Sequence, residues 1–531
     1  MKTTLQAITT LLVAGLLISA CVAAPTPETI VETVVVEKEV QVEKEVIVTR
    51  EVEKEVVVAP TPEPEVPHLT APGVQPYKGI TLKILTSEAV PELAYEHAIK
   101  DAMYIEASGV DLAYENVPWP DLVPKITTMC TAQTDDYDIF FMEDQWQAMF
   151  EGCTEELDRF YLAAPGAMDL EDLPIRTLGI ATNKKAWTGI PGLVPVGILA
   201  YRTDLFEDPD LQAEFKDTYG RDLELPKTWD ELLEVAQFFT RDMDGDGKND
   251  SWGLAHRYGN ANSLVSDWLI AFALPRGFSY FDKEFNPTIN SEAGIEAAKF
   301  FLAPEYLAVQ PPGAESADWA ETMQAMAQGR LAMFVTETWA IPLLLDPTQT
   351  MVADKIAFAP IPSWQDPDTG EMHNRTFFVG HSFAINHYSS EEAKWAAWDY
   401  LNFVRGSEYA KMFTEKTGAV LRHSQLTDPA LIEMYPHIPV IAEAMTYPAG
   451  TRPSEPFSAE VVFTVGKEMS SVVAGDKEVE QAMNDANEEV RAIVERYGYY
   501  EFPHYNFDAQ ERMEMACEKM AELGVDHPDC K

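Results

Sequence analysis

The chain contains few basic residues. It has 39 Lys and Arg against 87 Asp and Glu over 531 residues, which gives a formal net charge of −48. A surface of this kind repels phosphate backbones, so no nucleic acid is expected as a partner. It also disfavours anionic lipids and anionic ligands unless a local basic pocket intervenes. Solubility outside the cell or adaptation to salt explains most of this charge equally well.

Cysteine is scarce as well, with five residues in the chain. None of the five has a CxxC spacing, so neither a zinc site nor a redox motif is supported. Setting Cys21 aside leaves an even number, which in an exported chain suggests two disulfides. The simplest pairing is Cys130–Cys153 and Cys517–Cys530, although three pairings are possible in principle.

Long apolar runs are missing beyond the first 21 residues, so no membrane-spanning segment is expected there. The start of the chain has Lys2, an apolar run from Leu11 to Ile18, and then Ile18-Ser-Ala-Cys21. This is the pattern of a bacterial lipobox, in which cleavage precedes the cysteine and the thiol carries diacylglycerol. We therefore expect residues 1–20 to be a signal peptide and Cys21 to anchor the protein at the outer face of the cytoplasmic membrane. An ordinary cleaved signal with an incidental cysteine is the alternative.

Residues 21–75 are predicted to form a stalk. Val-Glu-Lys-Glu-Val occurs three times, at 36–40, 42–46 and 52–56, with a period of two that favours extended chain. The proline-rich run at 59–67 favours a stiff spacer. Pairing between stalks through the valine face is a second interpretation.

The body of the chain predicts an α/β fold. Strand-like runs at 80–86, 110–116 and 138–142 alternate with helical stretches at 91–107 and 123–132. This alternation predicts a mostly parallel sheet.

Helices are expected to dominate the second half of the chain. Thr228 and Glu231 form a capping box at the start of one predicted helix. Residues 389–412 and 458–497 also have a largely helical pattern.

Five segments, in order, resemble the extracellular solute-binding proteins that feed ABC importers of sugars. They are Asp138–Gly152, Val194–Phe206, Pro226–Glu231 with Asp242–Asp250, Gly329–Trp339, and Val379–Asn386. The resemblance implies a two-lobed periplasmic-binding-protein-like clamp, with discontinuous lobes that close about a hinge. Lobe 1 would comprise 76–197 and 385–425, and lobe 2 would comprise 198–384 and 426–500. Residues 501–531 form a C-terminal extension outside the family pattern.

The resemblance also implies a set of solute-binding residues that combine flat aromatic rings with polar groups. Trp339 is the expected stacking ring, and Glu143 and Asp144 follow a strand end, where ligands collect in α/β sheets. The further candidates are Glu88, Trp146, Tyr258, Asn260, Trp268, His381 and Phe457. His381 stands where many relatives have tryptophan, which leaves room for a smaller or differently shaped solute.

The segment 242–250 predicts a structural calcium site. Asp242, Asp244, Asp246, the Lys248 carbonyl and Asp250 occupy positions 1, 3, 5, 7 and 9 of an EF-hand loop. Position 12 is Gly253, so the bidentate glutamate is missing and the affinity should be reduced. An Asp/Gly turn without metal is the alternative.

Two enzyme interpretations compete with binding. Gly380-His-Ser-Phe-Ala384 superficially resembles a nucleophile elbow but lacks its last glycine. Glu143 and Asp144 could serve a surface glycoside hydrolase, although adjacent residues rarely straddle a glycosidic bond. A receptor that presents its ligand to a sensor kinase is a third possibility. The favoured prediction is a monomeric, non-catalytic, lipid-anchored binding protein that delivers a solute, most simply a carbohydrate, to ABC permease subunits.

Overall fold

The structure is a computed structural model, and it describes one of the two units of the chain. The described residues are 77–87, 104–166, 168–183, 186–192, 194, 196–377, 380–501 and 509–531. The units are residues 1–63 and 64–531, and all described residues belong to the second. The predictions for residues 1–20, Cys21, the stalk at 21–75 and Glu88 lie outside the described residues. Within the described ranges, no helix has both the length and the apolar character that a membrane crossing requires.

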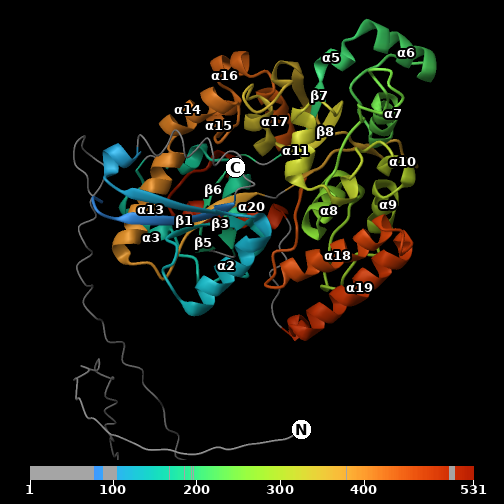
Figure 1. The fold of residues 1–531 in the computed structure, drawn as a ribbon. Helices are drawn as coiled ribbons and strands as arrows, with labels where there is room; N and C mark the ends of the chain where they lie inside the picture. Colours follow the sequence, from blue (N-terminus) through green and yellow to red (C-terminus); the bar gives the residue numbers. More distant parts are fainter. Residues whose placement is uncertain are drawn as a thin grey trace, which may run out of the picture. The chain divides into compact units, whose positions relative to one another are not determined.

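Lobe 1 is built on a five-stranded sheet in the order β2-β1-β3-β13-β6. Two of its neighbouring strands, β1 and β3, are labelled in Figure 1. The strands are β1 (Thr81–Ser87), β2 (Asp111–Val117), β3 (Ile139–Glu143), β6 (Ile190–Pro191) and β13 (His381–Ile385). β1 runs parallel to β2 and β3, whereas β13 runs antiparallel to β3 and β6. All five residues of β3 are buried, as its central place requires. The register sets His381 opposite Glu143, at the end of β3 from which the next loop emerges.

Helices cover this sheet and share its aromatic core. They include α2 (Trp119–Ala132), α3 (Asp158–Ala163), α4 (Ile175–Ile180) and α13 (Glu391–Arg405). The next helix, α14 (Ser407–Thr417), packs in a separate cluster with Phe403. Phe140, Phe160, Trp187 and Trp398 are among the fully buried rings. The helix predicted over 389–412 is two helices, because Gly406 between them has an extended backbone.

Lobe 2 has a three-stranded sheet in the order β8-β7-β9. Its strands are β7 (Gly197–Arg202), β8 (Met333–Glu337) and β9 (Ile356–Pro360). β7 is antiparallel to both neighbours, so the prediction of a mostly parallel sheet is wrong for this lobe. The strand-like runs predicted at 80–86, 110–116 and 138–142 all lie in lobe 1. The direction of the lobe 2 strands depends on where the chain crosses between lobes, which local patterning does not encode.

Helices make up most of lobe 2, and the predicted capping box is present at α7 (Trp229–Phe239). Thr228 Oγ1 accepts a hydrogen bond from the Glu231 amide at 3.1 Å, and the Glu231 carboxylate accepts one from the Thr228 amide at 3.4 Å. The other helices of this part are α5 (Thr203–Phe206), α6 (Pro209–Tyr219), α8 (Ala261–Trp268), α9 (Glu292–Phe301), α10 (Pro304–Leu307), α11 (Trp319–Ala327) and α12 (Ile341–Leu344).

The second half of the chain returns to both lobes. α15 (His423–Leu426), α16 (Pro429–Met434) and α17 (Ile438–Met445) follow α14, and residues of this segment share a core with β7 and β9. α18 (Ser458–Val473) contacts both α8 and α19 (Val479–Arg496), and the three lie side by side in Figure 1. Because β13 belongs to the lobe 1 sheet, the return to lobe 1 begins by His381 and not at the predicted residue 385.

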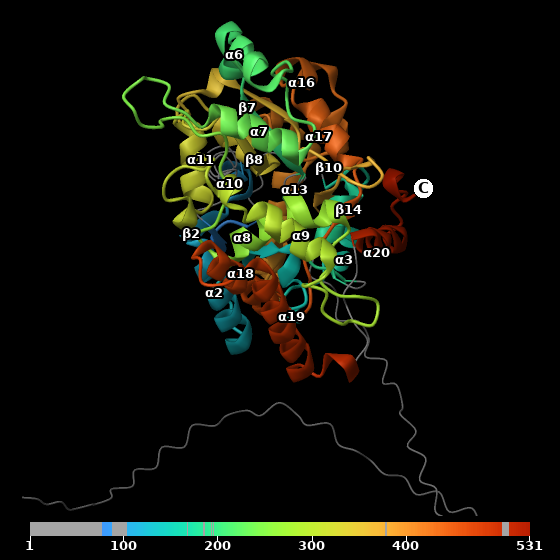
Figure 2. The same ribbon diagram turned by 90° about the vertical axis from the view of Figure 1, so that its right-hand side faces the viewer.

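Short strands and the C-terminal extension complete the fold. The two-residue strands are β4 (Thr182–Asn183), β5 (Ala186–Trp187), β10 (Trp364–Gln365), β11 (Met372–His373), β12 (Thr376–Phe377) and β14 (Ala449–Gly450). α20 (Ala509–Glu522) of the extension contacts α4 and β14, as Figure 2 also shows for β14. β12 pairs with β14, and this pairing joins the segment before β13 to the segment before α18.

Both disulfides of the simplest pairing are present. Cys130 at the end of α2 bonds Cys153, and Cys517 in α20 bonds Cys530, each with 5.5 Å between Cα atoms. The second bond closes a loop within the extension. Among the described residues this accounts for every cysteine.

Candidate functional site

Glu143 and Asp144 lie at the end of β3 and are almost completely buried. Both carboxylates bind the same atom, Nη2 of Arg452, with 2.5 Å between that nitrogen and Asp144 Oδ1. Arg512 of the extension donates to the Asp144 carbonyl oxygen at 3.2 Å. The two carboxylates are therefore not exposed on a solvated loop, because both are paired with an arginine that follows β14.

One guanidinium facing two carboxylates sets the electrostatics of this cluster. Burial raises the pKa of Glu143, and the attraction of Arg452 offsets only part of that rise. Burial acts against the charge of Arg452, but Asp144 and Glu143 outweigh it and raise the pKa of Arg452. The arginine thus stays charged, and burial favours the protonated form of Glu143.

Gln145 connects this strand end to lobe 2. Its Nε2 lies 3.4 Å from Asn262 Oδ1 on α8 and 3.5 Å from Glu143 Oε2. Gln145 Oε1 and Asp144 Oδ2 are buried and have no hydrogen-bond partner among the described residues. Two buried oxygen atoms that can accept hydrogen bonds therefore lack a donor where the lobes meet.

Trp339 and His381 form a flat stack that spans the lobes. Trp339 follows β8 in η6 (Thr338–Ala340), whereas His381 opens β13. Their ring centroids are 5.5 Å apart and their planes differ by 3°. His381 also stacks on Phe141 of β3, at 4.9 Å. Histidine at this position thus supplies a planar aromatic ring to the stack.

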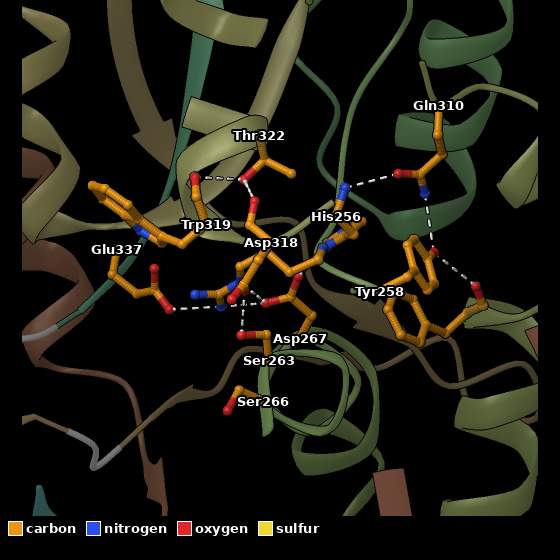
Figure 3. Close-up of polar contacts among 12 residues, drawn as sticks. His256, Tyr258, Ser263, Ser266, Asp267, Gln310, Asp318, Trp319, Thr322 and Glu337 are labelled. Atoms are coloured by element: carbon orange, nitrogen blue, oxygen red, sulfur yellow. Dashed lines mark hydrogen bonds and ion pairs between the residues drawn. The ribbon is translucent and has the colours of Figure 1, made fainter. Parts of the chain in front are cut away.

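Glu337, at the end of β8, belongs to a buried charge network (Figure 3). Its Oε1 accepts from Arg257 Nη2 at 3.0 Å, and Arg257 also binds Asp267 through Nε at 2.8 Å. Asp267 in turn accepts from the Arg257 amide at 2.8 Å. Although burial alone would raise it, the pKa of Asp267 is lowered to about 2 by Arg257 and His256. The network fixes one oxygen of Glu337, while Oε2 is buried without a partner among the described residues.

His256 anchors the other side of this network. Its Nδ1 lies 3.2 Å from Asp267 Oδ2 and its Nε2 lies 2.9 Å from the Tyr306 hydroxyl. The His256 amide donates to Gln310, whose Nε2 donates to the Tyr258 hydroxyl at 3.0 Å (Figure 3). Tyr258 is thus an interior member of the network.

Several predicted solute contacts have packing or capping roles. Trp146 packs on Trp119 beneath the loop, with 5.3 Å between ring centroids. Asn260 caps α8 by accepting from the Ser263 amide. Tyr258, Trp268 and Phe457 are buried against Phe301, Phe278 and Tyr499, respectively. Their placement does not support the predicted ligand contacts, because α8 and the residues around it turn these rings into the core of lobe 2.

The residues that sequence reasoning missed are Gln145, Arg257, Asn262, Glu337 and Arg452. Glu337 precedes the predicted Trp339 by two positions, and Arg257 adjoins the predicted Tyr258. Arg452 begins the short segment that leads to the predicted Phe457. The signal available for Gln145, Arg257 and Glu337 was proximity in the chain to a predicted aromatic residue, whereas Asn262 and Arg452 had no such neighbour.

Ser382, the serine of the elbow-like sequence, is in the middle of β13, paired with Met142. Its Oγ accepts from Gln147 at 3.4 Å and the residue is fully buried. A nucleophile elbow requires a sharp turn between strand and helix, and this serine has neither the turn nor the exposure.

The predicted calcium loop brings three carboxylates together. Asp242, Asp244 and Asp250 offer oxygen atoms that all lie within 4.8 Å of one another. Asp246 is not part of this group, and its Oδ1 accepts from the Lys248 amide at 2.9 Å. Backbone amides, with that of Gly247 foremost, lower the pKa of Asp242. Hard oxygen donors of this kind fit Ca²⁺.

Gly253 explains why the loop lacks its twelfth ligand. A Cβ at this position would lie 2.1 Å from the Ala236 carbonyl oxygen of α7. No glutamate fits there without displacing the helix backbone. Metal binding at this loop stays a prediction.

Two lobes on separate sheets, with polar strand ends and a shared aromatic stack between them, define a clamp-type binding protein. Residues 87–411 match the family model described as bacterial extracellular solute-binding protein, and the chain belongs to this family. Its relatives include a protein of Sinorhizobium fredii named probable amino-acid ABC transporter periplasmic-binding protein, 26% identical over 80% of this chain and 91% of that protein. The mannitol-binding protein of Pseudomonas aeruginosa is 22% identical over 74% of this chain and 89% of its own length. Among solved structures, an ABC transporter solute-binding protein of Agrobacterium radiobacter in complex with ribitol aligns with a TM-score of 0.68 and 24% identity, covering 78% of this chain and 99% of the other.

Proposed function

We propose that the protein captures a neutral polyol or sugar between its lobes and delivers it to an ABC permease. The observation that carries this proposal is a set of buried polar atoms without hydrogen-bond partners among the described residues. They are Asp144 Oδ2, Gln145 Oε1, Glu337 Oε2 and Trp339 Nε1. A buried polar atom left unpaired costs about 1–3 kcal/mol, so a ligand that pairs them recovers that free energy.

The chemistry of these atoms favours hydroxyl groups. Three of the four are acceptors and one is a donor, and a hydroxyl can fill either role. The Trp339–His381 stack adds an aromatic surface of the kind that packs against the C–H groups of a polyol chain or sugar ring. The ribitol complex and the mannitol-binding protein support the same class of solute.

A free amino acid fits less well. Its carboxylate would need a cation, and Arg257 and Arg452 are each already bound by two carboxylates. The name of the Sinorhizobium relative therefore carries less weight for this chain than the polyol-binding relatives do.

Calorimetric titration of the full-length protein with D-mannitol, ribitol, maltose and a panel of L-amino acids tests this function. We expect saturable binding of a polyol or sugar. Glu337→Gln should weaken it about 10-fold, because an amide presents a donor where the carboxylate had an acceptor. Glu468→Gln, at a second buried glutamate, which pairs with Lys467 and Lys477, should leave it unchanged. Binding of amino acids alone would contradict the solute class.

Binding without turnover is part of the proposal. Glu143 and Asp144 contact the same arginine nitrogen and so do not flank a substrate bond as a glycosidase requires. Chromatography of the bound sugar after long incubation should recover it unchanged, and hydrolysis products would contradict the proposal. Co-purification with permease subunits, as opposed to a sensor kinase, separates transport from ligand presentation.

Lipid anchoring at Cys21 belongs to the same proposal and is supported by the Ile18-Ser-Ala-Cys21 pattern. Mass spectrometry of the mature N-terminus should find a diacylglycerol on this thiol, and Cys21→Ser should release the protein from the membrane fraction. An unmodified Cys21 would indicate an ordinary secreted form. Light scattering checks the accompanying prediction that the protein is a monomer.

A further inference from the structure

A cavity apart from the proposed solute site lies at the junction of lobe 2, the β14 segment and the C-terminal extension. Its volume is about 580 Å³, within the range of small-molecule sites. Residues 277–280 of lobe 2, residues 446–451 around β14, and Ala509, Gln510 and Met513 of the extension line it. None of the residues proposed above to bind the solute is among them. In Figure 2 the two elements that enclose part of it, α20 and β14, lie beside each other.

The cavity is positively charged on a strongly acidic protein. Arg176 and Arg375 line it, and the described residues around it include no aspartate or glutamate. Asp529 is the acid that acts on Arg176, but its carboxylate already accepts from the Ile175 amide at 3.0 Å and contacts His423 at 2.7 Å. The positive charge of Arg176 is therefore not neutralised by a direct contact in the described part of the chain.

Arg176 is held in place with one nitrogen unused. Its Nη2 donates to the carbonyl oxygens of Met445 at 3.0 Å and Tyr447 at 2.9 Å, which fixes the plane of the guanidinium. The residue is only 6% exposed, and its Nη1 is buried without a hydrogen-bond partner among the described residues. Burial without a carboxylate contact lowers the pKa of this group to about 10.

Tyr280 contributes a second unused donor to the same cavity. The residue is 3% exposed, and its hydroxyl has no partner among the described residues. Its ring packs edge-on against Phe278, at 5.3 Å. The rest of the lining is largely apolar and includes Leu274, Pro448 and Met513.

We propose that this cavity binds an organic anion, whose carboxylate or phosphate group receives hydrogen bonds from Arg176 Nη1 and the Tyr280 hydroxyl while its apolar body packs on Leu274, Phe278 and Met513. Guanidinium donors in a fixed plane suit both kinds of oxyanion. Arg375 adds a second positive charge at the cavity wall. The lining of this cavity shares no residue with the proposed solute site, although the charge of Arg452 reaches Tyr280.

Three probes with the same apolar body separate the contributions of head group and chain. The full-length protein is titrated calorimetrically with heptanoate, hexyl phosphate and hexan-1-ol at constant ionic strength. At least one of the two anions should saturate with a Kd near or below about 1 mM. Hexan-1-ol should bind about 10-fold more weakly, because hydrogen bonds to charged groups are the stronger ones. The anion that saturates identifies the head group.

Matched variants locate the binding. Tyr280→Phe and Arg375→Gln should each weaken the bound anion about 5- to 10-fold, and Arg176→Gln should weaken it further. Arg221→Gln, at an arginine paired with Glu234 outside the cavity, should have no effect. Polyol affinity should stay constant in all four variants. If Arg176→Gln fails to fold, Tyr280→Phe and Arg375→Gln still decide the outcome.

Three results would overturn the proposal. The first is that neither anion saturates below about 10 mM, which would mean that only solvent fills the cavity. The second is equal affinity for hexan-1-ol and the anions. The third is wild-type anion affinity in both Tyr280→Phe and Arg375→Gln.

Discussion

The indole of Trp339 and the imidazole of His381 are parallel to within 3°, with 5.5 Å between their centroids. One ring follows a strand of lobe 2 and the other begins a strand of lobe 1. The Trp339 ring also packs on the cluster formed by α14 residues such as Tyr409 and Phe413. A single aromatic side chain thus contacts both halves of the clamp.

Trp339→Ala should weaken polyol or sugar binding by about 1–3 kcal/mol, the usual effect of truncating a buried aromatic anchor. Trp364→Ala is the matched control, because Trp364 also stacks on a histidine, His373, at 5.3 Å, but in the β10–β11 hairpin. Calorimetry on both variants provides the measurement. Equal affinities in the two would remove Trp339 from the site.

Arg257→Gln should lower the free energy of unfolding by about 3–5 kcal/mol, because it leaves the buried carboxylates of Asp267 and Glu337 without their cation. Arg221→Gln, at a half-exposed pair, should change it by about 1 kcal/mol or less. Urea denaturation followed by circular dichroism compares the two. Similar midpoints for both variants would show that the buried network contributes little to stability.

Asp399 makes stability depend on pH. Burial raises its pKa from 3.8 to about 7, despite a hydrogen bond donated by Tyr104 at 3.1 Å. Between these values the folded state keeps a proton that the unfolded state has lost, so the free energy of unfolding falls as the pH rises, by up to about 4 kcal/mol. The contribution is fully present below about pH 4 and is lost as the pH passes 7.

Asp399→Asn isolates this effect from the many other carboxylates, since asparagine still accepts from Tyr104. Urea midpoints from pH 4 to pH 8 should fall less steeply for the variant than for the wild type. Parallel pH profiles for the two proteins would refute the assignment.

Calcium should raise the melting temperature of the wild type relative to chelator, and Asp242→Asn should abolish the rise. Asp242 offers one of the three clustered carboxylates, and a metal that binds only the folded state stabilises it by mass action. Asp368→Asn, in the exposed β10–β11 turn, serves as the control. No difference between calcium and chelator in the wild type would favour a metal-free turn.

What could be predicted from the sequence was mainly local. The capping box at Thr228, the buried strand ending at Glu143 and the pairing of cysteines 13 and 23 residues apart all depend on neighbours in the chain. The order of family-like segments added the two-lobed architecture. These features follow from short-range patterns of hydrogen bonding and apolar spacing.

The contacts that define the site are long-range. Arg452 and Glu143 are 309 positions apart, and no periodicity connects them. Likewise, Tyr258, Trp268 and Phe457 could be recognised as aromatic residues near the site, but whether a ring faces a solute or a core depends on the rotation of α8 and α18. Strand direction in lobe 2 was missed for the same reason.

The register between β13 and β3 restricts how this protein can change in length. His381 faces Glu143 and Ser382 faces Met142, and successive side chains of a strand point to opposite sides of the sheet. Deleting one residue within β13 would therefore turn the serine toward Trp339 and send the imidazole to the other side. Loops of the chain can gain or lose residues over evolutionary time, but we expect homologues that keep the aromatic stack to keep the spacing of this five-residue strand.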